Sequence, residues 1–293
     1  MIILMGLVAV TGVASLYVAA QTIRSAVGEA GTIDFVFLRL FTASDGKLPP
    51  FISFVSFLGP LVGLALGFDA VSGEHARRTL SRVLAQPIHR DALVNGKFLG
   101  GLAAVAAMLS ALWLAVGALG LVLIGVPPTA DEFVRLAAFL AVTVIYISFW
   151  LALSILFSTV FRQAATSALA GIAAWLFFAI FADLLADLAA AALVPAAAGG
   201  NPEAIFAQEQ IRLWLSRLSP VTLYSEAVST LLTPSIRALG PVMVEQILGA
   251  LQGVLPIGQS LLLVWPQVVG LITGTAACFA ASYILFMRRE IRA

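Results

Sequence analysis

Charge is scarce in this sequence. Of its 293 residues only 11% are charged, with 16 Lys and Arg against 15 Asp and Glu and a net charge of +1. Soluble domains are about one quarter charged. The near balance of the two signs leaves no basic excess to neutralise a nucleic-acid backbone, so a DNA- or RNA-binding role is excluded.

Thiol and imidazole groups are rarer still. The one cysteine, Cys278, excludes an intramolecular disulfide and any site built from several cysteines. The two histidines, His75 and His89, both fall in a polar connector, which excludes a Ser–His pair within a membrane span, and the sequence has no H-E-x-x-H motif. It has no G-x-x-x-x-G-K-[ST] loop for ATP either. We therefore predict no catalytic residue, no metal site and no bound cofactor.

Long hydrophobic runs are what the sequence has in abundance. Hydrophobic residues make up 61% of the chain, and the mean hydropathy is +1.05. A helix of about 20 apolar residues crosses about 30 Å of hydrocarbon. Six stretches are long enough, at residues 2–20, 51–68, 98–126, 134–161, 164–182 and 261–286. Because these runs lack the alternation of a membrane barrel, we predict an all-α integral membrane protein with six transmembrane helices in a single domain, residues 1–293.

The distribution of Lys and Arg predicts how these helices are oriented. Nine of the 16 cluster in short segments: after the second stretch, at Arg162 after the fourth, and in the C-terminal tail. Positive charge stays on the cytoplasmic side, whereas charges dispersed in longer segments have little weight. We therefore predict a multi-pass protein of the cytoplasmic (inner) membrane with both termini in the cytoplasm.

The segment of about 195–260 is the longest one outside the apolar stretches. It contains apolar residues at helical spacing, such as Ile211, Trp214, Leu215 and Leu218, and several prolines divide it. We predict an extracytoplasmic loop with several short amphipathic helices that lie against membrane lipid.

Two smaller patterns concern helix packing and polarity. Gly59, Gly63 and Gly67 recur every four residues, a spacing that lets helix backbones approach closely, so we predict tight packing of the second span within or between protomers.

Asp183 and Asp187 lie four residues apart near the outer end of the fifth span. Carboxylates inside a membrane mark a polar pathway. The alternative, which we favour, is that the helix has left the hydrocarbon there and both carboxylates are solvated.

The densest polar sequence lies at residues 69–97. If residues 74–85 are helical, the polar residues fall on one side of the helix and the apolar ones on the other. Such a helix is either a solvated connector whose arginines fix the topology or a docking surface for a cytoplasmic partner. The pattern alone leaves both interpretations open.

The same region resembles the signature of ABC-2 type exporter permeases. It contains Gly67-Phe68-Asp69-Ala70, then Glu74, Thr79-Leu80, Leu84, Pro87, Arg90 and Gly96-Lys97-Phe98. A tight turn at residues 161–163, and Leu218-Ser219-Pro220 followed by Tyr224, extend the resemblance more weakly over the chain. The branch that it resembles most serves nitrous oxide reductase maturation and copper processing.

The resemblance implies that residues 70–97 form a coupling segment that docks on a separate ATP-hydrolysing subunit. Matching positions assign this role to Glu74, Thr79, Leu80, Pro87, Arg90 and Lys97, and the arginines of the same helix join them as docking residues: Arg77, Arg78 and Arg82. Ala76 stands where the family usually has a second acidic residue, and Arg78 stands where it usually has glycine. These two departures bear on which partner the segment binds.

The resemblance also implies a homodimer or a paired permease, and it implies that this chain is not itself an enzyme. The expected function is export of a substrate, or mechanical driving of an extracytoplasmic maturation partner. Two other functions stay open. A secondary transporter needs ionisable residues at mid-bilayer, of which the six stretches have almost none. A non-transporting scaffold could hold an extracellular maturation factor through residues 195–260.

Overall fold

The computed structural model describes residues 6, 10–14, 17–21, 35–42, 49–77, 90–125, 127–194, 202–233 and 256–288. These residues form helices and, among themselves, no strands, so the all-α prediction is confirmed. Within this part of the chain five helices are long and apolar enough to cross a membrane. They are α3 (Phe51–Gly67) with its continuation into α4 (Ser72–Ala76), α6 (Arg90–Ile124), α7 (Ala130–Val160), α8 (Ala164–Leu176) with its continuation, and α13 (Ile257–Arg288).

The first predicted span lies partly outside the described residues. Residues 10–14 and 17–21 of it are helical. The remaining helices are shorter: α2 (Val36–Thr42), the π-helix η1 (Phe177–Phe181), α9 (Ala182–Leu193), α10 (Pro202–Ser216) and α11 (Pro220–Leu232).

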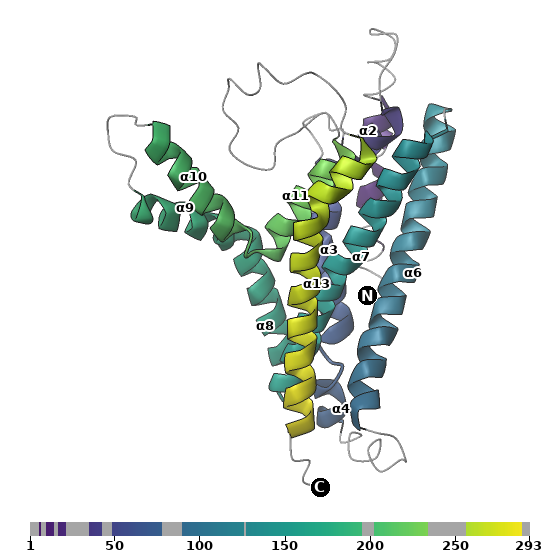
Figure 1. Ribbon diagram of the computed structural model, residues 1–293. Helices are drawn as coiled ribbons and strands as arrows, with labels where there is room; N and C mark the ends of the chain where they lie inside the picture. The colour runs from purple at the N-terminus through teal and green to yellow at the C-terminus, as the bar shows by residue number, and fades with distance from the viewer. Residues whose placement is uncertain are drawn as a thin grey trace.

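Helix α7 is the centre of the bundle, with α3, α6, α8, α11 and α13 packed around it (Figure 1). Its sequence explains this position, because large side chains occur on all sides of the helix and not in one stripe. Trp150, Tyr146, Ile147, Leu151 and Ile155 of α7 are among the largest fully buried side chains of the described residues. These large side chains fill the spaces between α7 and the helices that surround it.

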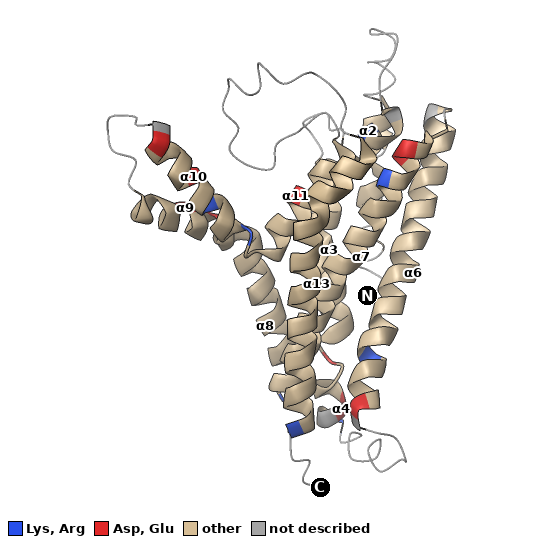
Figure 2. Cartoon of the chain, in the orientation of Figure 1, with Lys and Arg blue, Asp and Glu red and all other residues tan. Residues whose placement is uncertain are grey.

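The bundle has two distinct ends (Figure 1). Helix α4, the start of α6 and the last turn of α13 lie together at one end, here called the α4 end. Helix α2, the end of α6 and the starts of α7 and α13 lie at the other, here called the α2 end. Lys97 is near the start of α6 and Arg288 ends α13, so both belong to the α4 end, whereas Arg135 is near the start of α7, at the α2 end. Figure 2 shows charged residues of the bundle near both of its ends.

The three glycines of α3 lie against α7. A Cβ atom at Gly63 would lie 2.7 Å from the carbonyl oxygen of Ile147, and one at Gly67 would lie 2.7 Å from Cβ of Ser154. At Gly59 the nearest atom would be Cδ1 of Ile147, at 3.2 Å. No side chain fits between the two backbones at the first two positions. The glycine face of α3 is therefore covered within the chain.

The fifth span bends at a position that the sequence did not reveal. Residues 177–181 form the π-helix η1, and beyond it α9 leaves the bundle sideways and pairs with α10 (Figure 1). A π-turn leaves backbone carbonyl groups without their usual partners. The hydroxyl of Ser219 donates to the carbonyl oxygen of Phe178 at 3.4 Å, and Pro220 then begins α11. The Leu218-Ser219-Pro220 motif thus lies against the bend.

Candidate functional site

An ion pair joins the two ends of the predicted coupling segment. Nζ of Lys97 in α6 lies 2.6 Å from Oε1 of Glu74 in α4. The Glu74 side chain is 17% exposed and that of Lys97 is 38% exposed, so the pair is partly shielded from water and its attraction is less screened than at an open surface. The pair therefore joins α4 to α6 at the α4 end.

The start of this segment is attached to the central helix through Ser158. The Ser158 hydroxyl, in the last turn of α7, accepts hydrogen bonds from the backbone N–H groups of Val71 and Ser72, each at 3.0 Å. The two serine hydroxyls also lie 3.0 Å apart, and both residues are buried. The first N–H groups of a helix have no partner within it. Ser158 supplies that partner for α4, so a displacement of α4 acts directly on α7.

The other predicted docking residues are only partly described. Arg77 is exposed, with Nη2 3.4 Å from Oδ2 of Asp69 and Nε donating to the carbonyl oxygen of Gly73 at 3.2 Å. Helix α4 begins two residues before the predicted helix of residues 74–85. Five predicted docking residues lie outside the described residues: Arg78, Thr79, Leu80, Arg82 and Pro87. Arg90 is the first residue of α6, and its side chain is also outside them.

A buried charge cluster at the α2 end was missed by the sequence analysis, which treated Arg135 as one of the dispersed charges. The Arg135 side chain is fully buried. Its Nε donates to Oδ2 of Asp131 at 2.7 Å, and its Nη1 donates to the Leu231 carbonyl oxygen at 3.2 Å and to Oγ of Ser260 at 3.1 Å. One guanidinium group therefore joins α7 to α11 and α13.

Glu132 extends this cluster to α2. It is 4% exposed, and its Oε1 accepts a hydrogen bond from the backbone N–H of Phe37 at 2.9 Å. Its Oε2 accepts from the backbone N–H of Thr129 at 2.8 Å, which completes a capping box at the start of α7. The Thr-x-x-Glu spacing, with an Asp–Arg pair at i, i+4, is a sequence signal that could have indicated this helix start.

A second polar group on α11 holds α13. Glu226 accepts from Nε of Arg217 at 3.0 Å and from Nε2 of Gln267 at 3.0 Å. Gln267 is 4% exposed and follows Pro266, which lies inside α13. Proline interrupts the hydrogen bonding of a helix. The Glu226 contact is therefore made next to the proline at which the hydrogen bonding of α13 is interrupted.

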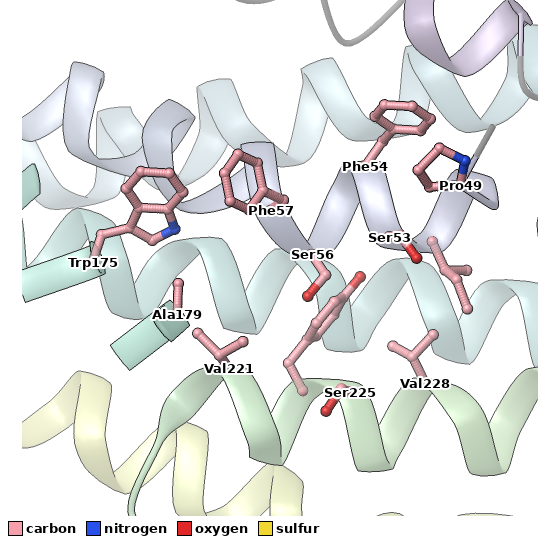
Figure 3. Close-up of a pocket in the computed structure, with 12 residues that line it drawn as sticks. Pro49, Ser53, Phe54, Ser56, Phe57, Trp175, Ala179, Val221, Ser225 and Val228 are labelled. Carbon is pink, nitrogen blue, oxygen red and sulfur yellow. The ribbon is translucent and has the colours of Figure 1, made fainter. Parts of the chain in front are cut away.

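A pocket of about 530 Å³ opens between α3, the α8–η1 helix and α11 (Figure 3). Phe54, Phe57 and Trp175 give it aromatic walls, and Ser53 and Ser225 add hydroxyl groups. Behind it, buried Tyr224 stacks on Tyr146 with ring centroids 4.1 Å apart, and its hydroxyl lies 3.0 Å from Oγ1 of Thr143. The stacked pair fixes the floor of the pocket.

The predicted polar-pathway residues lie beyond the bend of the fifth span. Asp183 and Asp187 are exposed on α9. Oδ1 of Asp183 accepts from Oγ1 of Thr222 at 3.3 Å, and Oδ1 of Asp187 lies 3.7 Å from Nε of Arg212. Arg212 also donates to Glu209 at 2.8 Å, and this hydrogen bond lowers the pKa of Glu209 below its ordinary value. Neither aspartate lines the pocket.

Long apolar helices that pack around a central apolar helix define a multi-pass membrane protein. A family model described as "ABC-2 family transporter protein" matches residues 1–291, and the chain belongs to this family. The family membership predicted from residues 67–98 is thereby confirmed.

Two curated proteins are similar to this chain, and both are called "probable ABC transporter permease protein NosY". The one from Pseudomonas aeruginosa is 29% identical over 188 residues, and the one from Stutzerimonas stutzeri is 28% identical over 185 residues. Each alignment covers 63% of this chain and 63% of the relative's own length.

Proposed function

We propose that this ABC-2 permease couples ATP hydrolysis in a separate nucleotide-binding subunit to the export of a substrate, with residues 70–97 as the docking segment. The observation that carries the proposal is the ion pair between Glu74 and Lys97, which ties α4 to α6 at one end of the bundle. A segment held at both ends can receive a push and transmit it as a unit.

The contacts supply a route from this segment to the rest of the bundle. Closure of two nucleotide-binding subunits on ATP is a rigid-body motion of the kind that moves attached helices. Ser158 joins α4 to α7, and the glycine face joins α7 to α3. Because α3 forms one wall of the pocket, movement of the α3–α7 pair changes the shape of the pocket.

The assembly completes the proposal. We expect the permease to work as a homodimer or with a second permease, with two nucleotide-binding subunits at the α4 end. That end would face the cytoplasm, in the cytoplasmic (inner) membrane, and both termini would be cytoplasmic. The α4 end carries Arg77, Lys97 and Arg288, which agrees with the retention of positive charge on that side.

Charge substitutions at the ion pair test the docking role. The chain is expressed with the nucleotide-binding protein encoded beside it and purified from membranes through an affinity tag. We expect Glu74→Lys and Lys97→Glu each to reduce the amount of co-purified nucleotide-binding protein, and the double substitution to restore most of it. Glu203→Lys, which makes the same charge change at an exposed position of α10 outside residues 70–97, is the matched control.

The outcomes separate the alternatives. If both single variants insert normally and keep their partner, the coupling segment does not dock it. If the wild-type chain brings down no nucleotide-binding protein, the ABC export proposal fails as a whole.

One observation favours a second function, in which the permease drives or holds an extracytoplasmic partner. The α9–α10 hairpin projects from the bundle and exposes Trp214 (72%) and Leu218 (75%) (Figure 1). Co-purification of an extracytoplasmic protein that is lost on Trp214→Ser, while ATPase association is kept, would support this function. Unchanged membrane extraction of that variant would show that the residue does not merely contact lipid.

A further inference from the structure

Trp175 carries a polar group that the fold does not satisfy. The residue is only 6% exposed, and its Nε1 has no hydrogen-bond partner among the described residues. A buried indole N–H normally finds a partner, and leaving one unmade costs free energy. Trp175 lines the pocket between α3, α8 and α11. Figure 3 shows its nitrogen on the side of the ring toward Ala179, and the atom is buried beneath the lining of the pocket.

The walls around this donor are built for an apolar molecule. The ring of Phe57 packs edge-on against the Trp175 ring, with centroids 4.8 Å apart. Phe54 lies farther along α3, and Val221 and Val228 line the opposite side from α11 (Figure 3). A volume of about 530 Å³ is within the range of small-molecule sites.

The polar groups of the pocket are all neutral. None of its 12 lining residues is charged. The hydroxyl of Ser225 donates to the carbonyl oxygen of Thr222 at 2.9 Å, so its hydrogen is already used within α11. A charged ligand would lose its hydration here without gaining a counter-charge. A pure hydrocarbon would leave the indole N–H unpaired.

We infer that this pocket binds an uncharged, mainly apolar molecule, and that a carbonyl or ether oxygen of this molecule accepts a hydrogen bond from the buried Nε1 of Trp175 once the lining side chains around it move aside. The identification of this molecule as the class of exported substrate rests on the proposed function. Binding itself does not, because the pocket belongs to this chain alone and needs no nucleotide-binding subunit.

Photolabelling with benzophenone tests the inference. Benzophenone is a neutral diaryl ketone whose carbonyl is both the hydrogen-bond acceptor and the photoreactive group. The purified chain in lipid nanodiscs is irradiated with increasing benzophenone, and the label is located by peptide mass spectrometry. We expect saturable labelling within residues 49–57, 175–179 or 221–228. We expect 4-benzoylbenzoate, the same probe with a carboxylate, to label these segments about tenfold less at equal concentration, because burial of an unpaired charge is costly.

Substitutions identify the donor. Trp175→Phe keeps the aromatic wall and removes the N–H, and we expect the half-saturating benzophenone concentration to rise about 3- to 10-fold, as for loss of one neutral hydrogen bond. Trp113→Phe is the matched control, because Nε1 of Trp113 also lacks a partner among the described residues but lies outside this pocket. Ser225→Phe, at an exposed position of α11, fills the pocket without touching Trp175 and should also suppress labelling.

Three results would overturn the inference. They are equal labelling by the neutral and charged probes, labelling that does not saturate and spreads over the exposed faces of α6 and α13, and an unchanged half-saturation in Trp175→Phe. If the pocket is labelled saturably but the chain recruits no nucleotide-binding protein, the binding inference holds and the proposed export function fails. If the chain recruits that protein but the pocket is not labelled, the proposed function holds and the binding inference fails.

Discussion

Ser158 of α7 accepts a hydrogen bond from the backbone N–H of Ser72 in α4, 86 positions earlier in the chain, and this contact attaches the coupling segment to the central helix. In Ser158→Ala two buried N–H groups lose their acceptor. Each unsatisfied group lowers the free energy of unfolding by about 1–3 kcal/mol. We expect a lower melting temperature of the purified chain and weaker coupling between ATP hydrolysis and transport in the assembled system.

Ser148→Ala is the control for this prediction. Ser148 is also buried on α7, but its hydroxyl donates to the Val144 carbonyl oxygen of its own helix. If both variants uncouple hydrolysis equally, the contact with α4 has no special role.

Gly63 permits the close approach of α3 to α7. In Gly63→Ala the new methyl group would lie 2.7 Å from the Ile147 carbonyl oxygen and 2.9 Å from the Leu151 nitrogen. Backbone atoms cannot move aside as a flexible side chain can, so we expect destabilisation of about 1–3 kcal/mol. Thermal unfolding in detergent measures it. Gly100→Ala in α6, where nothing lies within 4 Å, should be neutral or stabilising.

Arg135 holds three helices at the α2 end. Arg135→Ala would leave Asp131, which is 36% exposed, without its cation and the Leu231 carbonyl without its donor, and each buried polar group left unsatisfied costs about 1–3 kcal/mol. We expect poor yield of folded protein and early loss of protease resistance. Arg39→Ala, on the exposed side of α2, should stay within about 0.5 kcal/mol of wild type.

Glu209 makes the α9–α10 hairpin sensitive to acid. Its hydrogen bond with Arg212 holds the pKa below the ordinary 4.5, so the folded state binds its proton less readily than the unfolded state does. The stabilisation is complete above pH 4.5 and is lost as the pH falls through the lower folded pKa. Hydrogen exchange of α10 should therefore accelerate in that range. Glu209→Gln should abolish this pH dependence, whereas Glu203→Gln should retain it.

The membrane spans were predictable because hydrocarbon imposes a length and an apolar composition on any helix that crosses it. The bend at residues 177–181 was not, since Phe-Phe-Ala-Ile-Phe contains no proline or glycine and reads as an uninterrupted span. What marks the bend is tertiary: the Ser219 hydroxyl reaches the Phe178 carbonyl from 41 positions away.

The same distinction applies to the candidate sites. Glu74 and Lys97 were singled out by family resemblance, but their ion pair depends on how α4 and α6 meet. The sequence shows a local partner for Arg135, Asp131, but not its partners Leu231 and Ser260, which lie 96 and 125 positions later. The pocket combines residues of α3, the α8–η1 helix and α11, none of which carries a recognisable motif for it.

The interlocked backbones of α3 and α7 limit how this protein can change shape. At Gly63 and Gly67 the two helices are in backbone contact, so neither can slide or roll past the other without collision. Any alternation between inward and outward states would therefore move α3 and α7 together, as one unit, against the helices that surround them.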